Sequence, residues 1–385
     1  MALVFLYCGL ILSLALIAPY LLYYRFIKGY ARKPNLNTPT LNQHPRISLI
    51  ICTLNAEKTI DAKMRDLLLL NYPLDRLDVT VVDGGSTDQT VKKAIGLKQE
   101  LAEQIRIKII ADKHLPTKAS QTNEGIGASE GEIVVTTDAD VFLHPDSIRA
   151  LADSLSVSGI GAACSKQVPM EPSRNVISRT ESSYRGLYDI LRLGESNLHS
   201  TPIFNGGLSG YRKEALSRID EDVNADDTRL ALGAIRKGFR AVYSPSSMFY
   251  VGVAANLRDA WRQRVRRGQG IQRHLWRNRD LASRRFRSFA FPIFAANFYM
   301  HLISPILFVA ASACFAIFLA ISAFKLPALV LPMVLILSLG SFILRETRIG
   351  IILISFSLYQ LALFWAMVLH LFGHDFVRWS NVASN

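Results

Sequence analysis

Residues 132–140 read Glu132-Ile-Val-Val-Thr-Thr-Asp138-Ala-Asp140, an apolar run that ends in two carboxylates. The apolar part is typical of a buried strand, so Asp138 and Asp140 would stand where that strand meets its loop. Mg²⁺ and Mn²⁺ prefer oxygen ligands, and one or two protein carboxylates together with substrate phosphates commonly hold them. We therefore predict a divalent metal, Mg²⁺ or Mn²⁺, on Asp138 and Asp140, with a nucleotide diphosphate as its natural companion.

Three similar runs precede this one, at Ile47–Cys52, Asp78–Asp83 and Arg106–Ile110, and the strand within the quoted stretch is expected at Ile133–Thr137. Strands that alternate with helices indicate an α/β domain with a doubly wound, mostly parallel sheet. Ligands of such sheets bind outside the carboxyl ends of the strands. The intervening helices are expected at Ala56–Leu70, Gln89–Gln104 and Lys118–Ala128.

Polar residues gather at these predicted strand ends. Thr53, Asn55 and Glu57 follow the first strand, and Asp83-Gly-Gly-Ser-Thr-Asp88 ends the second. Asp83 could accept hydrogen bonds from a base or a ribose, and Gly84-Gly85 lets the backbone approach a ligand closely. The alternative is that Ser86-Thr-Asp88 caps the following helix, and a cap and a ligand loop can share residues.

Six segments in order along Pro45 to Gln272 resemble the membrane-integrated inverting glycosyltransferases of family two, which have a GT-A fold (Rossmann-like, with a mostly parallel sheet). The first three are Asp83–Asp88, Lys118-Ala119 with Asn123, and Asp138-Ala-Asp140. The others are Phe204-Asn-Gly-Gly207 with Arg212, Ala225-Asp-Asp227 with Leu230, Gly238 and Tyr243, and Gln263-Arg-Val-Arg266.

The resemblance implies a role for each motif. Asp227 would be the general base of an inverting transfer, with Asp226 as its catalytic neighbour, and a metal would offset the charge of the departing diphosphate. The alternative for this acidic pair is capping of a helix at Thr228–Lys237. The acceptor would contact Asn205, Gly206 and Gly207. A UDP- or GDP-sugar donor would contact Thr53, Asn55, Glu57, Asp83, Lys118, Asp138, Gln263, Arg266 and Arg267.

One position departs from the family pattern, because Arg267 stands where the motif normally has Trp. In the polysaccharide synthases of the family, that Trp stacks on the acceptor sugar at the channel entrance. Its replacement puts processive polymerisation in doubt. We therefore expect transfer of one or a few sugars, with a processive synthase that extrudes its polymer as the alternative.

Half of the 385 residues are hydrophobic, and the surplus lies at the two ends. Leu3–Tyr24 is long enough to cross a bilayer, and the basic residues that follow it favour a retained anchor over a signal peptide. Three further spans are expected at Phe298–Phe324, with a kink at Pro305, and at Leu326–Leu344 and Ile349–Phe372. The positive-inside rule places residues 25–287 on the cytoplasmic face of a multi-pass membrane protein. Four nearly charge-free runs argue against helices of a soluble core.

Residues 258–287 carry eleven arginines and two aspartates, with Leu257, Trp261, Val265, Ile271, Leu275 and Trp276 interleaved. This pattern predicts amphipathic helices on the anionic membrane surface. Nucleic-acid binding, the rival interpretation of the basic net charge of +13, is disfavoured by the adjoining spans. The four cysteines are too scattered for a disulfide framework.

These features divide the chain into five parts. They are a first transmembrane helix (1–24), a basic linker (25–45), a cytoplasmic GT-A domain (46–250), Arg-rich interface helices (251–290), and three transmembrane helices with a short tail (291–385). The predicted enzyme moves a sugar to a lipid or lipid-linked glycan. A membrane protein with a degenerate nucleotide-sugar domain is the non-enzyme alternative, and retention of Asp83, Asp138, Asp140 and Asp227 argues against it.

Overall fold

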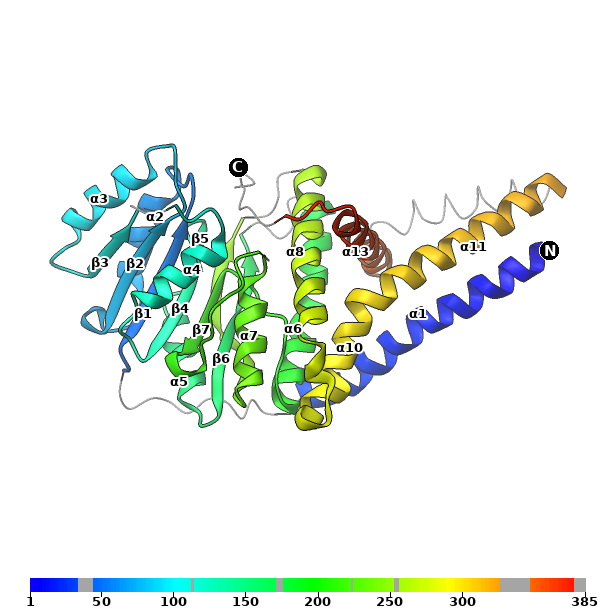
Figure 1. Cartoon of the computed structure of the whole chain (residues 1–385), viewed down its shortest axis with the longest axis horizontal. Coiled ribbons are helices and arrows are strands. Elements are labelled where there is room, and N and C mark those ends of the chain that lie inside the picture. The colour runs from blue at the N-terminus through cyan, green and yellow to red at the C-terminus, as the bar shows by residue number, and fades with distance from the viewer. Residues whose placement is uncertain are drawn as a thin grey trace.

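The computed structural model describes residues 1–33, 44–111, 114–170, 176–222, 224–252, 256–325 and 347–376. Its centre is a sheet of eight strands in the order β3-β2-β1-β4-β7-β6-β8-β5 (Figure 1). The strands are β1 (Ile47–Thr53), β2 (Leu77–Asp83), β3 (Arg106–Ile110), β4 (Ile133–Asp138), β5 (Val141–Leu143), β6 (Ile160–Pro169), β7 (Leu208–Arg212) and β8 (Arg240–Val251).

The four predicted strands are confirmed, and they form the parallel half of the sheet. β1 pairs in parallel with β2 and β4, and β2 pairs in parallel with β3. The other half is mixed, because β7 runs antiparallel to both β4 and β6, and β5 runs antiparallel to β8. The sheet is therefore mostly parallel but not doubly wound throughout.

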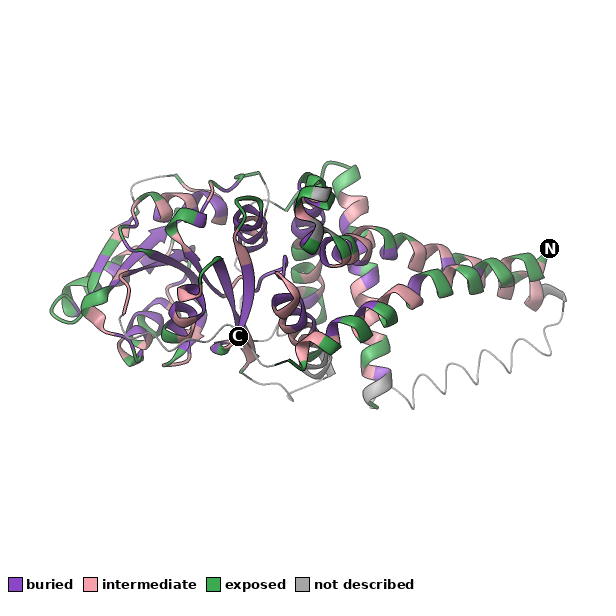
Figure 2. Cartoon of the chain, turned by 90° about the horizontal axis from the view of Figure 1, so that it is seen from below, coloured by how far each residue is buried: buried purple, intermediate pink, exposed green. Residues whose placement is uncertain are grey.

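Helices cover both faces of the sheet, which explains why β1 is buried along its whole length. Ile47, Leu49 and Ile51 join one hydrophobic core, whereas Ile50 and Cys52 join the other. The first core includes residues of α2 (Ile60–Asp66), α3 (Thr90–Glu100) and α5 (Ser147–Ser156), and the second includes residues of α4 (Lys118–Gly127) and α7 (Asp226–Arg236). Figure 2 shows the resulting buried interior of the sheet domain.

Most predicted boundaries differ from the observed ones by a few residues, and two differences are informative. The helix expected at Ala56–Leu70 is the short α2 followed by a single tight turn at Leu67–Leu69. The first membrane helix, α1 (Ala2–Ala31), extends seven residues into the predicted linker at 25–45. It does so because Ile27 is fully buried and packs with Leu191 of α6 (Val176–Leu198).

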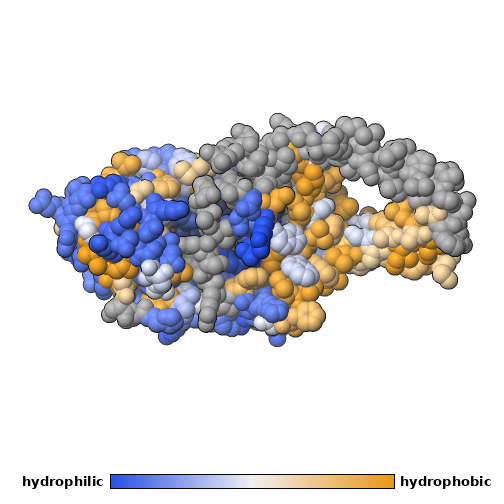
Figure 3. All heavy atoms as spheres, turned by 90° about the horizontal axis from the view of Figure 1, so that it is seen from above, coloured by the Kyte–Doolittle hydropathy of each residue, from blue (hydrophilic) through white to orange (hydrophobic). Residues whose placement is uncertain are grey.

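Three helical segments are long and apolar enough to cross a membrane, namely Ala2–Ala31, Phe291–Ala323 and Gly350–Leu371. They include α1, the chain from α10 (Ala295–Phe298) through α11 (Ser304–Lys325), and α13 (Arg348–Leu371). Three of the four predicted spans are thus observed, and the fourth, Leu326–Leu344, lies outside the described residues. Figure 3 shows hydrophobic surface over this end of the molecule and mostly hydrophilic surface over the sheet domain. This division indicates membrane association.

The Arg-rich region differs from its prediction. It is mainly α8 (Leu257–Arg277), which lies between the sheet domain and α13 (Figure 1). Val265 packs against α13, and Ile271 and Leu275 join a core of the sheet domain. Only Leu257 and Trp276 of the predicted apolar face are exposed. The apolar periodicity of α8 therefore indicates a face that is buried within the protein more than one that contacts lipid.

Candidate active site

The loops after β1 and β2 are joined by side chains that were predicted to bind the donor. Asn55 accepts a hydrogen bond from the Thr87 amide at 2.9 Å, and the Asn55 amide donates to the Ser86 hydroxyl at 2.8 Å. Asn55 has a positive φ of 50°, which non-glycine residues other than Asn and Asp rarely adopt. Glu57 accepts a hydrogen bond from the Gln89 amide at 3.1 Å, just before α3 begins. Asn55 and Glu57 thus shape these loops.

Asp83 is buried at the end of β2, and its carboxylate is occupied by its own loop. It accepts hydrogen bonds from the amides of Gly85 and Ser86 at 2.9 and 2.8 Å, and from the Thr53 hydroxyl at 3.2 Å. Gly84 is closely packed here, because a Cβ would lie 2.1 Å from the side-chain nitrogen of Gln121 and 3.1 Å from the Leu115 carbonyl oxygen. Asp83 therefore organises the loop that would face a nucleoside.

The cap that competed with a ligand role is present at the end of the same loop. Asp88 accepts hydrogen bonds from the amide and hydroxyl of Thr90 at 3.0 and 2.5 Å. Thr90 is the first residue of α3, so Asp88 satisfies one of the free amides of the helix start.

Lys118 lies at the centre of the predicted site. Its ammonium is 2.7 Å from Asp138 Oδ1 and 4.0 Å from Asp226 Oδ1, and it donates to the Gly206 carbonyl at 3.4 Å. Burial opposes the charge of Lys118, but Asp138 and Asp226 outweigh burial and raise its pKa. One lysine thus joins the end of β4, the start of α7 and the glycine segment before β7.

Asp226 and Asp227 are both buried and open α7, where backbone amides stabilise negative charge. Burial, followed by repulsion from Asp226, raises the pKa of Asp227 to about 6, although Arg267 and Lys118 oppose the shift. A Cβ on Gly206 would lie only 3.6 Å from Asp227 Oδ2. The carboxylate of Asp227 therefore borders the segment predicted to bind the acceptor.

The metal motif forms the turn between β4 and β5. Asp138 is partly buried beside Lys118, and burial raises its pKa to about 6, whereas Asp140 is exposed. Within the described residues, no cluster of three or more His, Cys, Asp or Glu side chains could hold a metal by itself. An exposed carboxylate next to a second one suits Mg²⁺ or Mn²⁺, which can complete their coordination with water and substrate phosphate.

The predicted acceptor segment lies beside the Arg-rich helix. Arg267 of α8 donates to the Phe204 carbonyl and to Asn205 Oδ1, both at 3.2 Å. Gly207 contacts the Phe249 ring so closely that a Cβ would lie 2.3 Å from it. Arg267 thus borders the predicted acceptor segment. At the position where the family motif normally has Trp, this chain has a guanidinium that contacts Asn205.

The other two residues of the α8 motif differ in placement. Arg266 is partly buried, and burial lowers its pKa against the attraction of Asp138, Asp226 and Asp140. Arg266 therefore faces the carboxylate cluster. Gln263 is exposed.

A lysine that sequence reasoning missed contacts the residues on either side of the Asp138–Asp140 turn. Lys63 of α2 is fully buried, and its ammonium donates to the Val141 carbonyl at 2.6 Å and to the Thr137 hydroxyl at 3.3 Å. Burial lowers the pKa of Lys63 to about 8, partly offset by Asp66, Asp138 and Asp140. The only sign in the sequence was that Lys63 occupies an apolar position of a short helix. Lysines are normally exposed, so this sign was easily missed.

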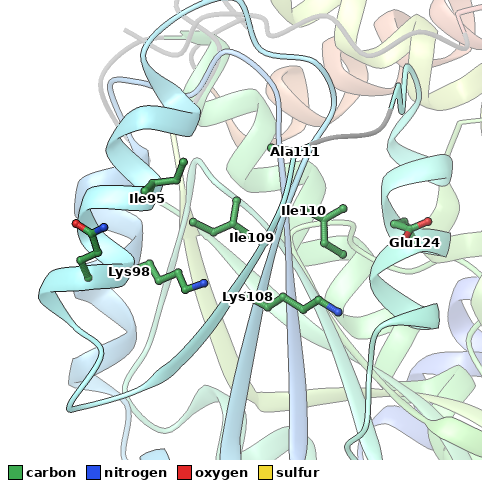
Figure 4. Close-up of a pocket in the computed structure, with 8 residues that line it drawn as sticks. Ile95, Lys98, Lys108, Ile109, Ile110, Ala111 and Glu124 are labelled. Atoms are coloured by element: carbon green, nitrogen blue, oxygen red, sulfur yellow. The ribbon is translucent and has the colours of Figure 1, made fainter.

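A hollow of about 690 Å³ lies elsewhere, beside the edge strand β3 (Figure 4). Its lining includes Ile95 and Lys98 of α3, Lys108 and Ile109 of β3, and Glu124 of α4. It contains none of the predicted site residues. The carboxylate cluster at the ends of β1, β2 and β4 remains the candidate active site.

Residues 48–220 match the family model described as "Glycosyl transferase family 2". The matched region is therefore a glycosyltransferase domain of family 2, and hydrophobic helices lie on either side of it in the chain. Among solved structures, it is similar to the mannosyltransferase PcManGT from Pyrobaculum calidifontis, in complex with GDP-Man and Mn²⁺. The similarity has 27% identity and a TM-score of 0.78, and covers 96% of this chain and 99% of that one.

Two curated relatives are poly-β-1,6-N-acetyl-D-glucosamine synthases. The protein from Staphylococcus aureus (strain COL) is 21% identical over 243 residues, which is 62% of this chain and 57% of the relative. The protein from Staphylococcus epidermidis (strain ATCC 35984) is 22% identical over 254 residues, which is 65% and 60%. The chain thus spans less than two thirds of the length of either relative.

Proposed function

We propose that the protein transfers a sugar, with inversion, from a nucleotide diphosphate sugar to a lipid or lipid-linked glycan at the cytoplasmic surface of a membrane. The observation that carries this proposal is the convergence of Asp138, Asp226 and Gly206 on Lys118, with Asp227 beside Gly206. These residues come from four separate parts of the fold, namely β4, α4, α7 and the segment before β7. Such an arrangement supplies a donor side and an acceptor side next to each other.

In this mechanism the acceptor hydroxyl attacks the anomeric carbon while the nucleoside diphosphate leaves. Asp227 takes the proton, and Asn205, Gly206 and Gly207 line the approach of the acceptor. Lys118 holds the Asp138 and Asp226 side chains in place, and Arg266 adds positive charge on the diphosphate side. Asp140 and Asp138 would hold Mg²⁺ or Mn²⁺, which would offset the charge of the diphosphate.

The donor can be identified by release of nucleoside diphosphate from protein purified in detergent. GDP-mannose is the first donor to test, because the similar mannosyltransferase structure contains it. UDP-linked N-acetylglucosamine is the second, in view of the synthase relatives. We expect metal-dependent release with one of a panel of GDP- and UDP-sugars. Absence of release with every donor, at the level of the Asp227→Asn variant, would favour the non-enzyme alternative.

We expect the product to carry one or a few added sugars. Arg267 is held against Phe204 and Asn205, so no aromatic ring at this position stacks on a growing chain. Gel filtration of radiolabelled product measures the length. A product of high mass would instead support the processive synthase, the alternative suggested by the curated relatives.

The pKa of Asp227, raised to about 6, predicts an acidic limit on turnover. A base acts only when ionised, so a raised pKa makes activity fall at a higher pH than for an ordinary carboxylate. At saturating donor and metal, kcat should fall about tenfold per pH unit below that value and should level off above it.

The control for this pH dependence is Asp226→Asn. Asp226 raises the pKa of Asp227, so its neutralisation should move the acidic limb to lower pH. An acidic limb at the same pH in Asp226→Asn and in the unmodified protein would contradict the assignment to Asp227.

A further inference from the structure

Ala225, the residue before the acidic pair, has a left-handed backbone with φ 63° and ψ 51°. This conformation brings Cβ close to the following carbonyl oxygen, so residues other than Gly, Asn and Asp seldom adopt it. Strain of this kind persists only where the surroundings hold the backbone in place. The contacts around Ala225 should therefore reveal what holds the start of α7.

An ion-pair cluster attaches Asp222, just before α7, to α8. The Asp222 carboxylate receives both terminal nitrogens of Arg277, at 2.9 and 2.5 Å. Arg273 adds a bond to the Asp222 carbonyl at 3.0 Å and one to its carboxylate at 3.3 Å. A two-pronged arginine–carboxylate pair constrains direction as well as distance, so it positions the backbone better than a single surface ion pair does.

Asn224 provides a second attachment to the same helix. Its side-chain amide donates to the Arg266 carbonyl at 2.7 Å, and its own carbonyl lies 2.9 Å from His274 Nε2. Burial lowers the pKa of His274 to about 4, so the ring is neutral near pH 7 and Nε2 can carry the hydrogen. Gly270 makes this approach possible, because a Cβ there would lie 2.0 Å from Asn224 Oδ1.

α8 is in turn held by the membrane helices. Its Gly268 packs against Leu363 of α13, where a Cβ would lie 2.9 Å from a Leu363 methyl group. Gln272 donates to the carbonyls of His301 and Leu363 at 2.8 and 3.0 Å. The attachment of Asp222 and Asn224 thus continues through α8 into the two described membrane segments that follow it in the chain.

We propose that Asp222 is a positioning residue for the general base. Asp222 keeps Ala225 in its strained conformation, and Ala225 in turn fixes the Asp227 carboxylate beside Gly206. The proposal rests on the proposed function of Asp227 as the base. Asp222 itself does not touch the reacting atoms. Its effect passes through the backbone from Ala225 to the first turn of α7.

The test is Asp222→Ala in the full-length protein, with donor release and sugar transfer measured at saturating metal. We expect kcat to fall by roughly tenfold, because a displaced base loses its alignment with the acceptor hydroxyl, while the KM for donor stays unchanged. Arg277→Gln breaks the same pair from α8 and should give a similar loss if Asp222→Ala does not fold. A kcat equal to that of the unmodified protein in both variants would overturn the proposal.

Asp280→Ala is the matched control. Asp280 pairs with Arg236 at 2.9 Å, and its side chain is 53% exposed, close to the 58% of Asp222. This pair lies at the far end of α7 from the acidic residues, so the loss of Asp280 should leave kcat unchanged. An equal fall in kcat for Asp280→Ala and Asp222→Ala would show a general effect of weakened ion pairs and would overturn the proposal.

Two double variants separate positioning from a structural effect. Ala225→Gly removes the backbone strain, so it should restore part of the kcat lost in Asp222→Ala. In the Asp227→Asn background, Asp222→Ala should cause no further loss, because both act on one group. Additive losses there would overturn the proposal, whereas full activity of Asp227→Asn alone would instead refute the proposed base.

Discussion

Asp227→Asn is expected to reduce turnover by on the order of a hundredfold or more, because a positioned base contributes about that much to a proton transfer. Donor binding should remain nearly intact, since Asp227 lies beside Gly206, in the segment proposed to bind the acceptor. The substitution keeps the size of the side chain and its place at the start of α7. A donor-binding titration beside a transfer assay measures the two effects separately.

Asp226→Asn is the control for this prediction and should be milder. Asp226 lies 4.0 Å from Lys118 and accepts a hydrogen bond from the Thr122 hydroxyl at 3.5 Å. These contacts are with side chains of α4, so we expect Asp226 to hold the site together and not to take the proton. Equal transfer rates for Asp227→Asn and the unmodified protein would refute the base assignment. A larger loss in Asp226→Asn would exchange the roles of the two carboxylates.

Asp140→Asn is expected to abolish metal-dependent donor binding. A neutral amide is a much poorer ligand for a hard cation than a carboxylate, and few protein carboxylates share this site. Asp140 is exposed, so the thermal unfolding midpoint should hardly change. Donor affinity measured with and without Mn²⁺ gives the result, because only the metal-dependent part should disappear.

Asp75→Asn serves as the matched control, because Asp75 precedes β2 and its side chain is 81% exposed. It should bind donor and metal as the unmodified protein does. Full activity of Asp140→Asn with either Mn²⁺ or Mg²⁺ would count decisively against Asp140 as a metal ligand. Asp138 would then be the one carboxylate of the motif left as a candidate ligand.

The ends of the parallel strands were predictable to within one residue, because a continuous apolar run indicates a strand and shows where it stops. Thr53, Asp83 and Asp138 each end a strand, in β1, β2 and β4, and the parallel pairing places these ends along one edge. The expectation that ligand residues gather at that edge follows from local pattern and strand direction alone. The membrane segments were predictable for a similar reason, since their length and composition suffice.

The partners of each carboxylate at these strand ends were harder to predict from the sequence. Asp83 and Asp138 have the same residue type at the same kind of position, yet Asp83 is occupied by its own loop and Asp138 by Lys118. Which donor reaches a carboxylate depends on the backbone of the loop, here including the positive φ of Gly85. The difference arises after the strands have ended, where periodicity carries no information.

The amphipathic pattern of α8 shows a related limit. The spacing of Val265, Ile271 and Leu275 correctly indicates a buried face, but a helix buries its apolar face against protein or lipid with the same periodicity. Only the packing against α13 and the sheet domain shows that these residues are enclosed by protein.

The sequence by itself determined the four parallel strands β1 to β4, the helices that alternate with them, the three described membrane segments and the order of the family 2 motifs, because these depend on local composition and spacing. Only the tertiary structure decided which charges meet. Lys118 reaches Asp226, Lys63 reaches Val141, and Asp222 reaches Arg277 across separations that no local pattern encodes. Such pairs form when the sheet order and helix packing bring distant segments together, and each stabilises a conformation that its own segment would not adopt alone.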